Sequence, residues 1–210
     1  MVGDSLIGHW NGTFTSGHHY KPEFHDLFKQ YFTKSGGGKI EGLALGSSGD
    51  TSRNLLWHLQ NGILTNQFLH PKVWLILIGT NDLGHAMCSK QSALDGILYV
   101  AEHIKEQRPD AAILIHGLLP RGGDVGNGIQ MDLGRYWQHI QWINERLQEA
   151  VEQRKQYGFF YMDSGDTFIN DDGTALHSGY IRDGIHPELP GMKAWGPLIV
   201  KAVLKILKKY

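Results

Sequence analysis

A serine near the start of the chain and a histidine–aspartate pair near its end are the residues that could do chemistry. Ser5 closes the triplet Gly3-Asp4-Ser5, and the segment Asp183-Gly184-Ile185-His186 places the carboxylate and the imidazole three residues apart. A serine hydroxyl is a weak nucleophile at neutral pH and needs a base within hydrogen-bond reach. We expect Ser5 to be the nucleophile, His186 to be its base, and Asp183 to orient the imidazole and stabilise its charged form.

Attack on a carbonyl group also creates a negatively charged oxygen that needs hydrogen-bond donors. The backbone N–H groups of Ser5 and Gly49 and the side-chain amide of Asn81, in Gly79-Thr80-Asn81-Asp82, are the candidates. Glycine suits a position where the backbone must approach a substrate closely. Each segment alone is ordinary turn sequence. Together they predict a site that cleaves an ester.

The elements that must position these residues follow from hydrophobic patterning. Strand-like runs occur at residues 40–45, 73–78, 111–118 and 159–162, and amphipathic helical segments lie between them and after the last. This alternation predicts parallel βαβ units and a three-layer α/β/α fold. Ligands bind at the carboxyl ends of the strands in such sheets. Gly49 follows the first run and Gly79 follows the second, so both lie at that edge.

The segment before Ser5 is unusually short for a strand. Only Met1 and Val2 precede the Gly3 triplet, whereas a typical strand has ~5 or 6 residues. We therefore expect the first strand to be truncated. That would leave backbone groups of its neighbours without partners, which is costly in a buried sheet.

Composition narrows the range of partners. The 210 residues are 41% hydrophobic, enough for one core, so residues 1–210 are expected to form a single domain. The formal net charge of -1 gives no electrostatic case for nucleic acid. The longest apolar run, residues 73–78, is far shorter than the ~20 residues that span a membrane. Asp4 interrupts any signal-peptide pattern, which favours the cytoplasm.

Clusters of possible metal ligands do not have the spacing of known sites. His18 and His19, with His25 nearby, lack the paired histidines and catalytic glutamate of a zinc helix. A calcium loop is excluded in the same way for four aspartates, which are better explained by turn formation around Asp172-Gly173: Asp163, Asp166, Asp171 and Asp172. We expect no metal and no cofactor. Asp4 and Asp82 are expected to serve as turn or cap residues.

The four segments resemble the four blocks of the SGNH (GDSL) hydrolase family. Residues 49–62, the stretch Pro71-Lys72-Val73 and the stretch Gly117-Leu118-Leu119-Pro120-Arg121-Gly122 are similar to the catalytic subunits of intracellular platelet-activating-factor acetylhydrolase. The resemblance implies Ser5, Asp183 and His186 as a triad and Ser5, Gly49 and Asn81 as an oxyanion hole. It also implies a flavodoxin-like sheet, no cofactor, a small ester substrate with a short acyl group, and a homodimer.

Residues 10–38 depart from those relatives because they are longer and more polar, with a short helix expected at residues 22–33. A solvated surface excursion is favoured over a lid or a sugar-contacting loop. The expected function is a serine esterase that forms an acyl-serine intermediate. Two alternatives stay open. One is a carbohydrate acetyl esterase, in which Trp10 and Tyr20 could stack on a sugar, and the other is a non-catalytic interaction subunit that keeps the fold.

Overall fold

The computed structural model describes residues 1–13, 20–122, 124–125, 128–129 and 132–209. The strands are β1 (Val2–Gly3), β2 (Leu45–Gly46), β3 (Val73–Leu77), β4 (Ala112–His116), β5 (Asp124–Val125), β6 (Gly128–Ile129) and β7 (Phe159–Met162). Five of them form a parallel sheet in the order β2-β1-β3-β4-β7, and β5 and β6 form a separate antiparallel pair.

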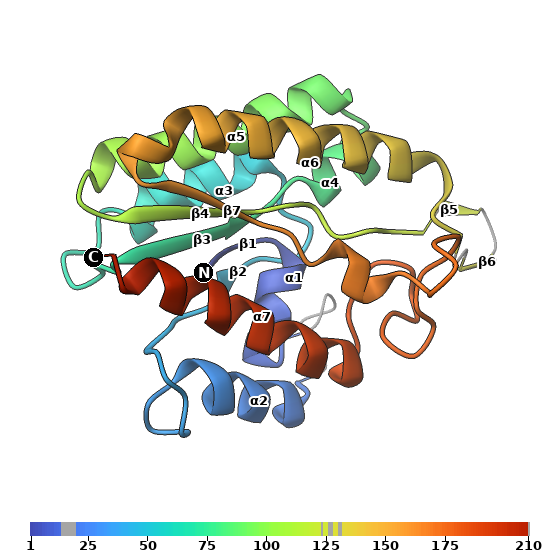
Figure 1. Ribbon diagram of the computed structural model, residues 1–210, viewed down its shortest axis with the longest axis horizontal. Helices are drawn as coiled ribbons and strands as arrows, with labels where there is room; N and C mark the ends of the chain where they lie inside the picture. Colours follow the sequence, from blue (N-terminus) through green and yellow to red (C-terminus); the bar gives the residue numbers. More distant parts are fainter. Residues whose placement is uncertain (14–19, 123, 126–127, 130–131, 210) are drawn as a thin grey trace.

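Helices cover both faces of the sheet, which gives the expected three layers (Figure 1). The helices are α1 (Ser5–Gly8), α2 (Pro22–Phe32), α3 (Ser52–His58), α4 (Thr80–Gly84), α5 (Lys90–Gln107), α6 (Gly134–Arg154) and α7 (Leu189–Leu207). Short 3-10 or π turns are η1 (His9–Asn11), η2 (Leu59–Ile63), η3 (Lys155–Tyr157) and η4 (Gly165–Phe168). Helices α3, α5 and α6 lie on one side of the sheet, and α1, α2 and α7 lie on the other.

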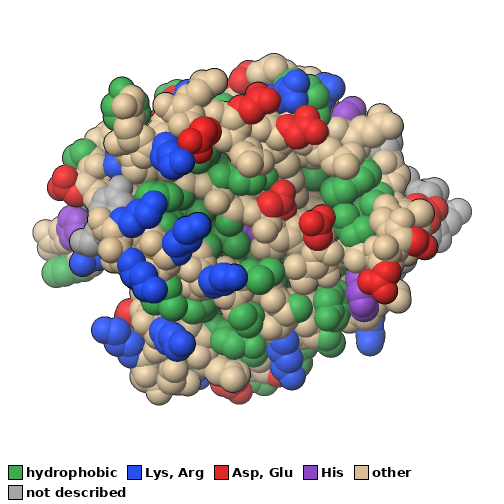
Figure 2. Space-filling model, viewed as in Figure 1, with side chains coloured by type: hydrophobic (Ala, Val, Ile, Leu, Met, Phe, Trp, Pro, Cys, Tyr) green, Lys and Arg blue, Asp and Glu red, His purple; other side chains and the backbone are tan. Residues whose placement is uncertain are grey.

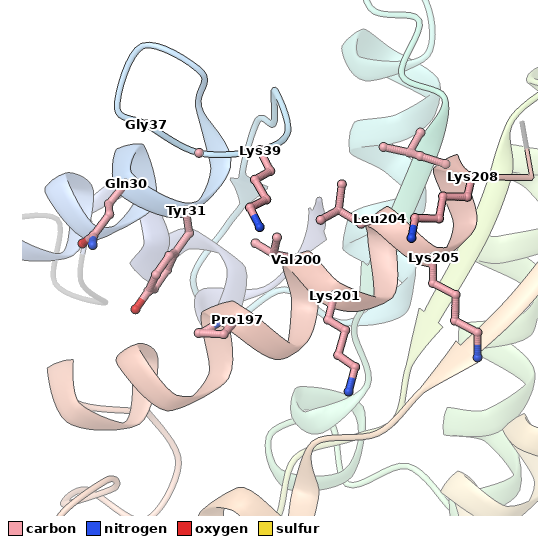
Figure 3. A pocket seen from close by; sticks show the side chains of 12 residues that line it. Gln30, Tyr31, Gly37, Lys39, Pro197, Val200, Lys201, Leu204, Lys205 and Lys208 are labelled. Carbon is pink, nitrogen blue, oxygen red and sulfur yellow. The ribbon is translucent and has the colours of Figure 1, made fainter.

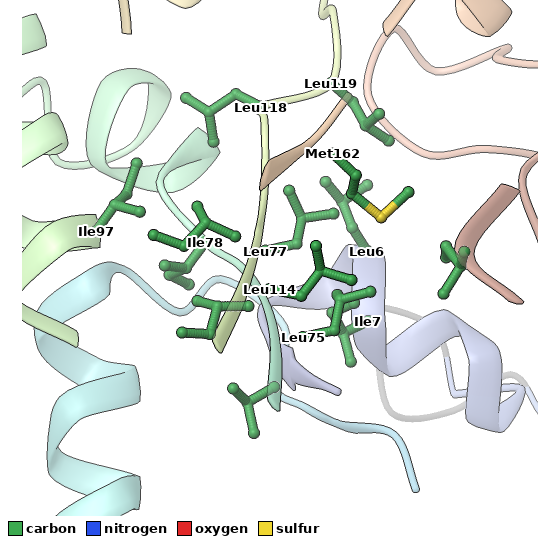
Figure 4. Packing of buried hydrophobic residues seen from close by; sticks show 14 of the residues in the cluster. Leu6, Ile7, Leu75, Leu77, Ile78, Ile97, Leu114, Leu118, Leu119 and Met162 are labelled. Carbon is green, nitrogen blue, oxygen red and sulfur yellow. The ribbon is translucent and has the colours of Figure 1, made fainter. Parts of the chain in front are cut away.

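The core forms on both faces of the central strands because β3 and β4 are near-continuous apolar runs. Leu75 and Leu77 of β3 point toward Leu6 and Ile7 of α1 (Figure 4). Strand residues alternate between the two faces of a sheet. The four side chains are buried, so α1, which begins with Ser5, is held firmly against β3.

Strand β1 lies inside the sheet, between β2 and β3, although it contains only two residues. Val2 pairs with Leu45 on one side and with Ile76 on the other. A Cβ atom on Gly3 would lie 2.0 Å from the carbonyl oxygen of Leu77, so only glycine allows the strand to approach this closely. The segment before Ser5 is short, as expected, yet it still forms a strand.

The prediction of a strand over residues 40–45 is wrong for most of that segment. Only Leu45–Gly46 form β2, because the two residues of β1 offer a ladder to no more than two partners. The preceding residues are held by other bonds, including the 2.6 Å bond from the Asn11 side-chain amide to the carbonyl of Ala44. The other predicted strands and the long helices are confirmed, with ends that differ by a few residues.

The segment of residues 10–38 is partly a core element. Helix α2 appears where a short helix was expected, and its buried residues pack against α7. Trp10 is fully buried, with its ring 5.0 Å from that of Phe32 and 5.6 Å from that of Trp195. The expectation of a solvated excursion is therefore wrong for α2, and Trp10 is unavailable to stack on a sugar. His18 and His19 lie outside the described residues.

Candidate active site

Ser5 is placed by the junction of β1 and α1 at the carboxyl edge of the sheet. Asp4 caps the helix, as predicted, because its Oδ1 accepts the backbone N–H of Leu6 at 2.9 Å. Ser5 is the first residue of α1, so its own N–H has no acceptor within the helix. Its side chain is directed at a loop from the other end of the chain.

The structure brings the predicted nucleophile, base and carboxylate together. Ser5 Oγ lies 2.8 Å from His186 Nε2, and His186 Nδ1 lies 2.5 Å from Asp183 Oδ2. With Nδ1 donating to the carboxylate, Nε2 of the neutral ring is the acceptor that faces the hydroxyl. This is the arrangement by which a histidine removes a proton from serine.

A compact turn holds the carboxylate and the imidazole in register. Asp183 Oδ1 accepts the backbone N–H groups of Ile185 at 2.9 Å and of His186 at 2.7 Å. The N–H of Gly122 donates to the carbonyl of Gly184 at 2.7 Å, which ties this turn to the loop after β4. The turn is therefore fixed from within and from a neighbouring strand end.

The charge state of Asp183 suits a partner for an imidazolium ion. Burial raises the pKa of this carboxyl, but the hydrogen bond and charge of His186 and the two backbone N–H donors outweigh burial and lower it to about 2. Asp183 is thus ionised throughout the neutral range. It can stabilise a proton gained by His186.

The candidate oxyanion donors lie in the first turns of α1 and α4 and in the loop of residues 47–50, and hydrogen bonds join this loop to the other two segments. The N–H of Ser47 donates to the carbonyl of Gly3 at 3.3 Å, and Asn81 Nδ2 donates to the carbonyl of Asp50 at 3.0 Å. The second hydrogen of that amide remains available. Gly49 has a φ of +81°, a conformation that favours glycine. Among the described residues, no acceptor bonds the N–H of Ser5 or Gly49.

Buried polar groups brace this cluster. Asp82 accepts the backbone N–H of Ser52 at 2.9 Å and its hydroxyl at 2.6 Å, so it caps α3 as a structural residue. Arg121 is buried, and its Nη1 donates to the carbonyl of Thr80 at 2.9 Å. These bonds hold the loop that carries Asn81 against both α3 and the loop after β4.

The sequence reasoning missed His9. Its ring centroid lies 4.5 Å from that of His186, and its side chain is 1% exposed. Burial, followed by the charge of His186, lowers the pKa of His9 to about 3, so the ring stays neutral near pH 7. The spacing could have indicated His9, because it follows Ser5 by four residues, which places the two side chains on one helix face.

The described part of the chain contains neither a cluster of metal-ligand side chains nor a membrane-spanning helix. Those residues contain no group of three or more His, Cys, Asp or Glu side chains that could hold a metal ion. Asp172 forms the predicted turn, with the N–H of Thr174 donating to its Oδ1 at 2.9 Å. None of the described helices has the length and apolarity needed to cross a bilayer.

Comparison with known proteins points to one group. Residues 1–194 match the model of the GDSL-like Lipase/Acylhydrolase family. The chain is 40% identical over 134 residues to platelet-activating factor acetylhydrolase IB subunit alpha2 from Rattus norvegicus, which is 64% of this chain and 52% of that protein. The chain spans about half the length of the curated relatives it matches.

Solved structures share the fold. A putative acylhydrolase from Bacteroides fragilis is 22% identical with a TM-score of 0.73, covering 98% of this chain and 86% of that one. A family 3 carbohydrate esterase from Clostridium thermocellum is 17% identical with a TM-score of 0.65, covering 99% of this chain and 95% of that one. The parallel five-stranded sheet with helices on both faces is common to this group.

Proposed function

Since this chain belongs to the GDSL-like lipase/acylhydrolase family, we propose that it is a serine esterase that hydrolyses a carboxylic ester through an acyl-serine intermediate. One observation carries the proposal: Ser5 Oγ, the His186 ring and the Asp183 carboxylate form a continuous hydrogen-bonded chain. This chain of bonds forms only if two residues 181 positions apart, Ser5 and His186, meet with Oγ facing Nε2.

In the proposed first step, Ser5 Oγ attacks the ester carbonyl while His186 Nε2 takes its proton. The N–H groups of Ser5 and Gly49 and the amide of Asn81 stabilise the oxyanion. Collapse of this intermediate breaks the bond to the alcohol, which leaves with the proton from His186. The acyl group stays on Ser5 Oγ.

In the second step, water attacks the acyl-serine with His186 again acting as base. Collapse releases the carboxylic acid and returns the proton to Ser5. Asp183 stabilises the imidazolium in both steps, as its lowered pKa allows. We propose a short acyl group, on the basis of the similarity to acetylhydrolase subunits. The same similarity supports a homodimer, which light scattering on the purified chain would test.

Ser5→Ala tests the role of the nucleophile. Turnover of a chromogenic acetyl ester should fall by roughly 10⁴ to 10⁶, with an unchanged melting temperature. A serine-directed phosphonate should label the native chain at Ser5. Retained turnover would relocate the nucleophile, and failure to label would favour a non-catalytic subunit.

A carbohydrate acetyl esterase is the second candidate. It is favoured by the fold shared with the Clostridium thermocellum esterase and by Tyr20, whose side chain is 58% exposed. Comparing kcat/KM on acetylated xylan and on a short-chain lipid ester distinguishes the two candidates. A clear preference for xylan would replace the first candidate with the second.

A further inference from the structure

A groove of about 750 Å³ lies away from the candidate active site, between the C-terminal half of α7 and the loop that follows α2. None of its lining residues belongs to the Ser5–His186 cluster. Its floor is apolar, because Val200 and Leu204 of α7 line it one helical turn apart (Figure 3). Gly37 and Gly38 form part of the opposite wall and leave it open.

Four lysines border this apolar floor, of which Lys201 and Lys205 point away from the loop that carries Gly37 and Lys39 (Figure 3). Lys201 and Lys205 of α7 and Lys208, the C-cap residue that follows it, are spaced by four and three residues, which places them on one helix face. Lys39 lies on the opposite wall, and its side chain points across the groove toward α7 (Figure 3). Figure 2 shows Lys and Arg side chains gathered over this half of α7, with apolar side chains between them.

Among the described residues, no acidic side chain forms an ion pair with these lysines. Within the described part of the chain, the ion pairs involve other residues, and Lys39, Lys201, Lys205 and Lys208 make none. Uncompensated positive charge along a groove creates a potential that attracts an anion. The apolar floor in turn favours a ligand that buries hydrocarbon.

We propose that this groove binds a single amphiphile with an anionic head and an apolar tail, of the class of long-chain carboxylates. The head would lie near the ammonium groups of Lys39 and Lys208, and the tail would lie along Val200 and Leu204. An acidic peptide or a small anion would use the lysines but leave the floor exposed. A bilayer surface is too flat to enter between a loop and a helix. The proposal does not depend on ester hydrolysis at Ser5.

Isothermal titration calorimetry on the full chain with octanoate, at concentrations below micelle formation, tests the binding. Two controls are compared with octanoate. Octanol has the same hydrocarbon tail but no charge, and acetate has the carboxylate but no long tail. We expect saturable octanoate binding with a negative heat-capacity change, weakened by added salt, and about tenfold tighter than either control. Equal affinity for octanoate and octanol, or for octanoate and acetate, would overturn the proposal.

Two sets of variants locate the site. The double variant Lys39→Gln/Lys208→Gln should weaken octanoate binding about tenfold, whereas Lys193→Gln, an exposed lysine of α7 outside the groove, should leave it unchanged. Leu204→Ser should weaken octanoate binding with no effect on acetate, at a melting temperature measured in parallel. An unchanged affinity in the double variant would refute the site. So would binding to phosphatidylserine vesicles without binding to free octanoate.

Discussion

Two ionisable side chains close to Ser5 have strongly lowered pKa values, and each keeps one charge state across the neutral range. The pKa of the Asp183 carboxyl is lowered to about 2, because the hydrogen bonds and charge of His186 outweigh the opposing effect of burial. Burial lowers the pKa of the His9 imidazole to about 3. Between pH 4 and pH 8, Asp183 therefore stays ionised and His9 stays neutral. The role proposed for His186 requires the neutral form of its ring.

A pH–rate profile follows from that assignment. We expect kcat/KM on an acetyl ester to fall on the acid side with a single ionisation, because a protonated His186 cannot accept the proton of Ser5. His9→Phe keeps a planar ring against His186 and should leave the position of this acid limb unchanged. A flat profile from about pH 5 to pH 8 would contradict the role of His186. A displaced limb in His9→Phe would show that His9 titrates with it.

The oxyanion role of Asn81 predicts a loss confined to the chemical step. Asn81→Ala should lower kcat by roughly 10² to 10³ with little change in KM, because the amide would stabilise charge that appears only in the transition state. Asn66→Ala, in an exposed loop, is the matched control. Steady-state kinetics on the same ester would measure both. A rise in KM at constant kcat would instead make Asn81 a substrate-binding residue.

At the scale of elements, α5 approaches α3 so closely that glycine is required between them. A Cβ atom on Gly96 of α5 would lie 2.2 Å from the hydroxyl of Ser52, which is itself bonded to Asp82. Alanine usually stabilises a helix interior by ~1 kcal/mol relative to glycine. Here we expect Gly96→Ala to destabilise the fold by about 1–3 kcal/mol, because the added carbon overpacks this contact.

Urea unfolding of Gly96→Ala would measure that cost. Glu106→Ala, on the exposed part of the same helix, should change the free energy of unfolding by no more than ~0.5 kcal/mol. If Gly96→Ala proved more stable than the native chain, α3 and α5 would be free to move apart. The Asp82–Ser52 bonds would then not hold the Asn81 loop rigidly.

The sequence predicted those elements whose pattern is local. Residues 73–77 form a strand because a continuous apolar run fits a strand covered on both faces. The run at residues 40–45 is interrupted by Glu41 and Gly42, and it gains only two ladder partners from β1. In α2, the helical spacing of Phe24, Leu27 and Phe28 signalled burial, yet the polarity of the surrounding segment was given more weight.

The sequence predicted which residues form the candidate site, but it did not predict the contacts that hold them in place. Residue type and order identified Ser5, Asp183 and His186, because few combinations of side chains can activate a hydroxyl. The bond from Gly122 to Gly184 and the tilted ring contact between His9 and His186 depend on how segments distant in the sequence meet. Such contacts leave no periodic trace in a single sequence.

At the scale of the whole molecule, Asp4 couples folding to pH. Burial raises the pKa of Asp4 from 3.8 to about 7, against a smaller opposing effect of the Leu6 N–H. The folded state therefore holds a proton that the unfolded state releases, so the stabilisation is complete below about pH 4 and is lost as pH rises to about 7. This contribution of Asp4 declines as pH rises, whereas the lowered pKa of His9 makes an opposing contribution that increases between about pH 3 and pH 6.5.

Asp4→Asn removes this dependence while keeping a side chain that caps helices equally well. Between about pH 4 and pH 7, the variant should gain roughly 4 kcal/mol relative to the native chain. Urea unfolding at several pH values would measure the difference. Parallel stability curves for the two proteins would mean that Asp4 is ionised in the fold.

The turn at residues 183–186 means that the acid–base couple is preassembled. Its carboxylate and imidazole are joined to each other and to the same few backbone amides, so displacement of this turn would separate both from Ser5 as one body. A displacement of this turn that inactivated the protein would therefore leave the hydrogen bond between Asp183 and His186 intact. A strongly deshielded Nδ1 proton, observed by nuclear magnetic resonance, should therefore persist in Ser5→Ala, and its disappearance would show that the hydroxyl helps to hold the ring.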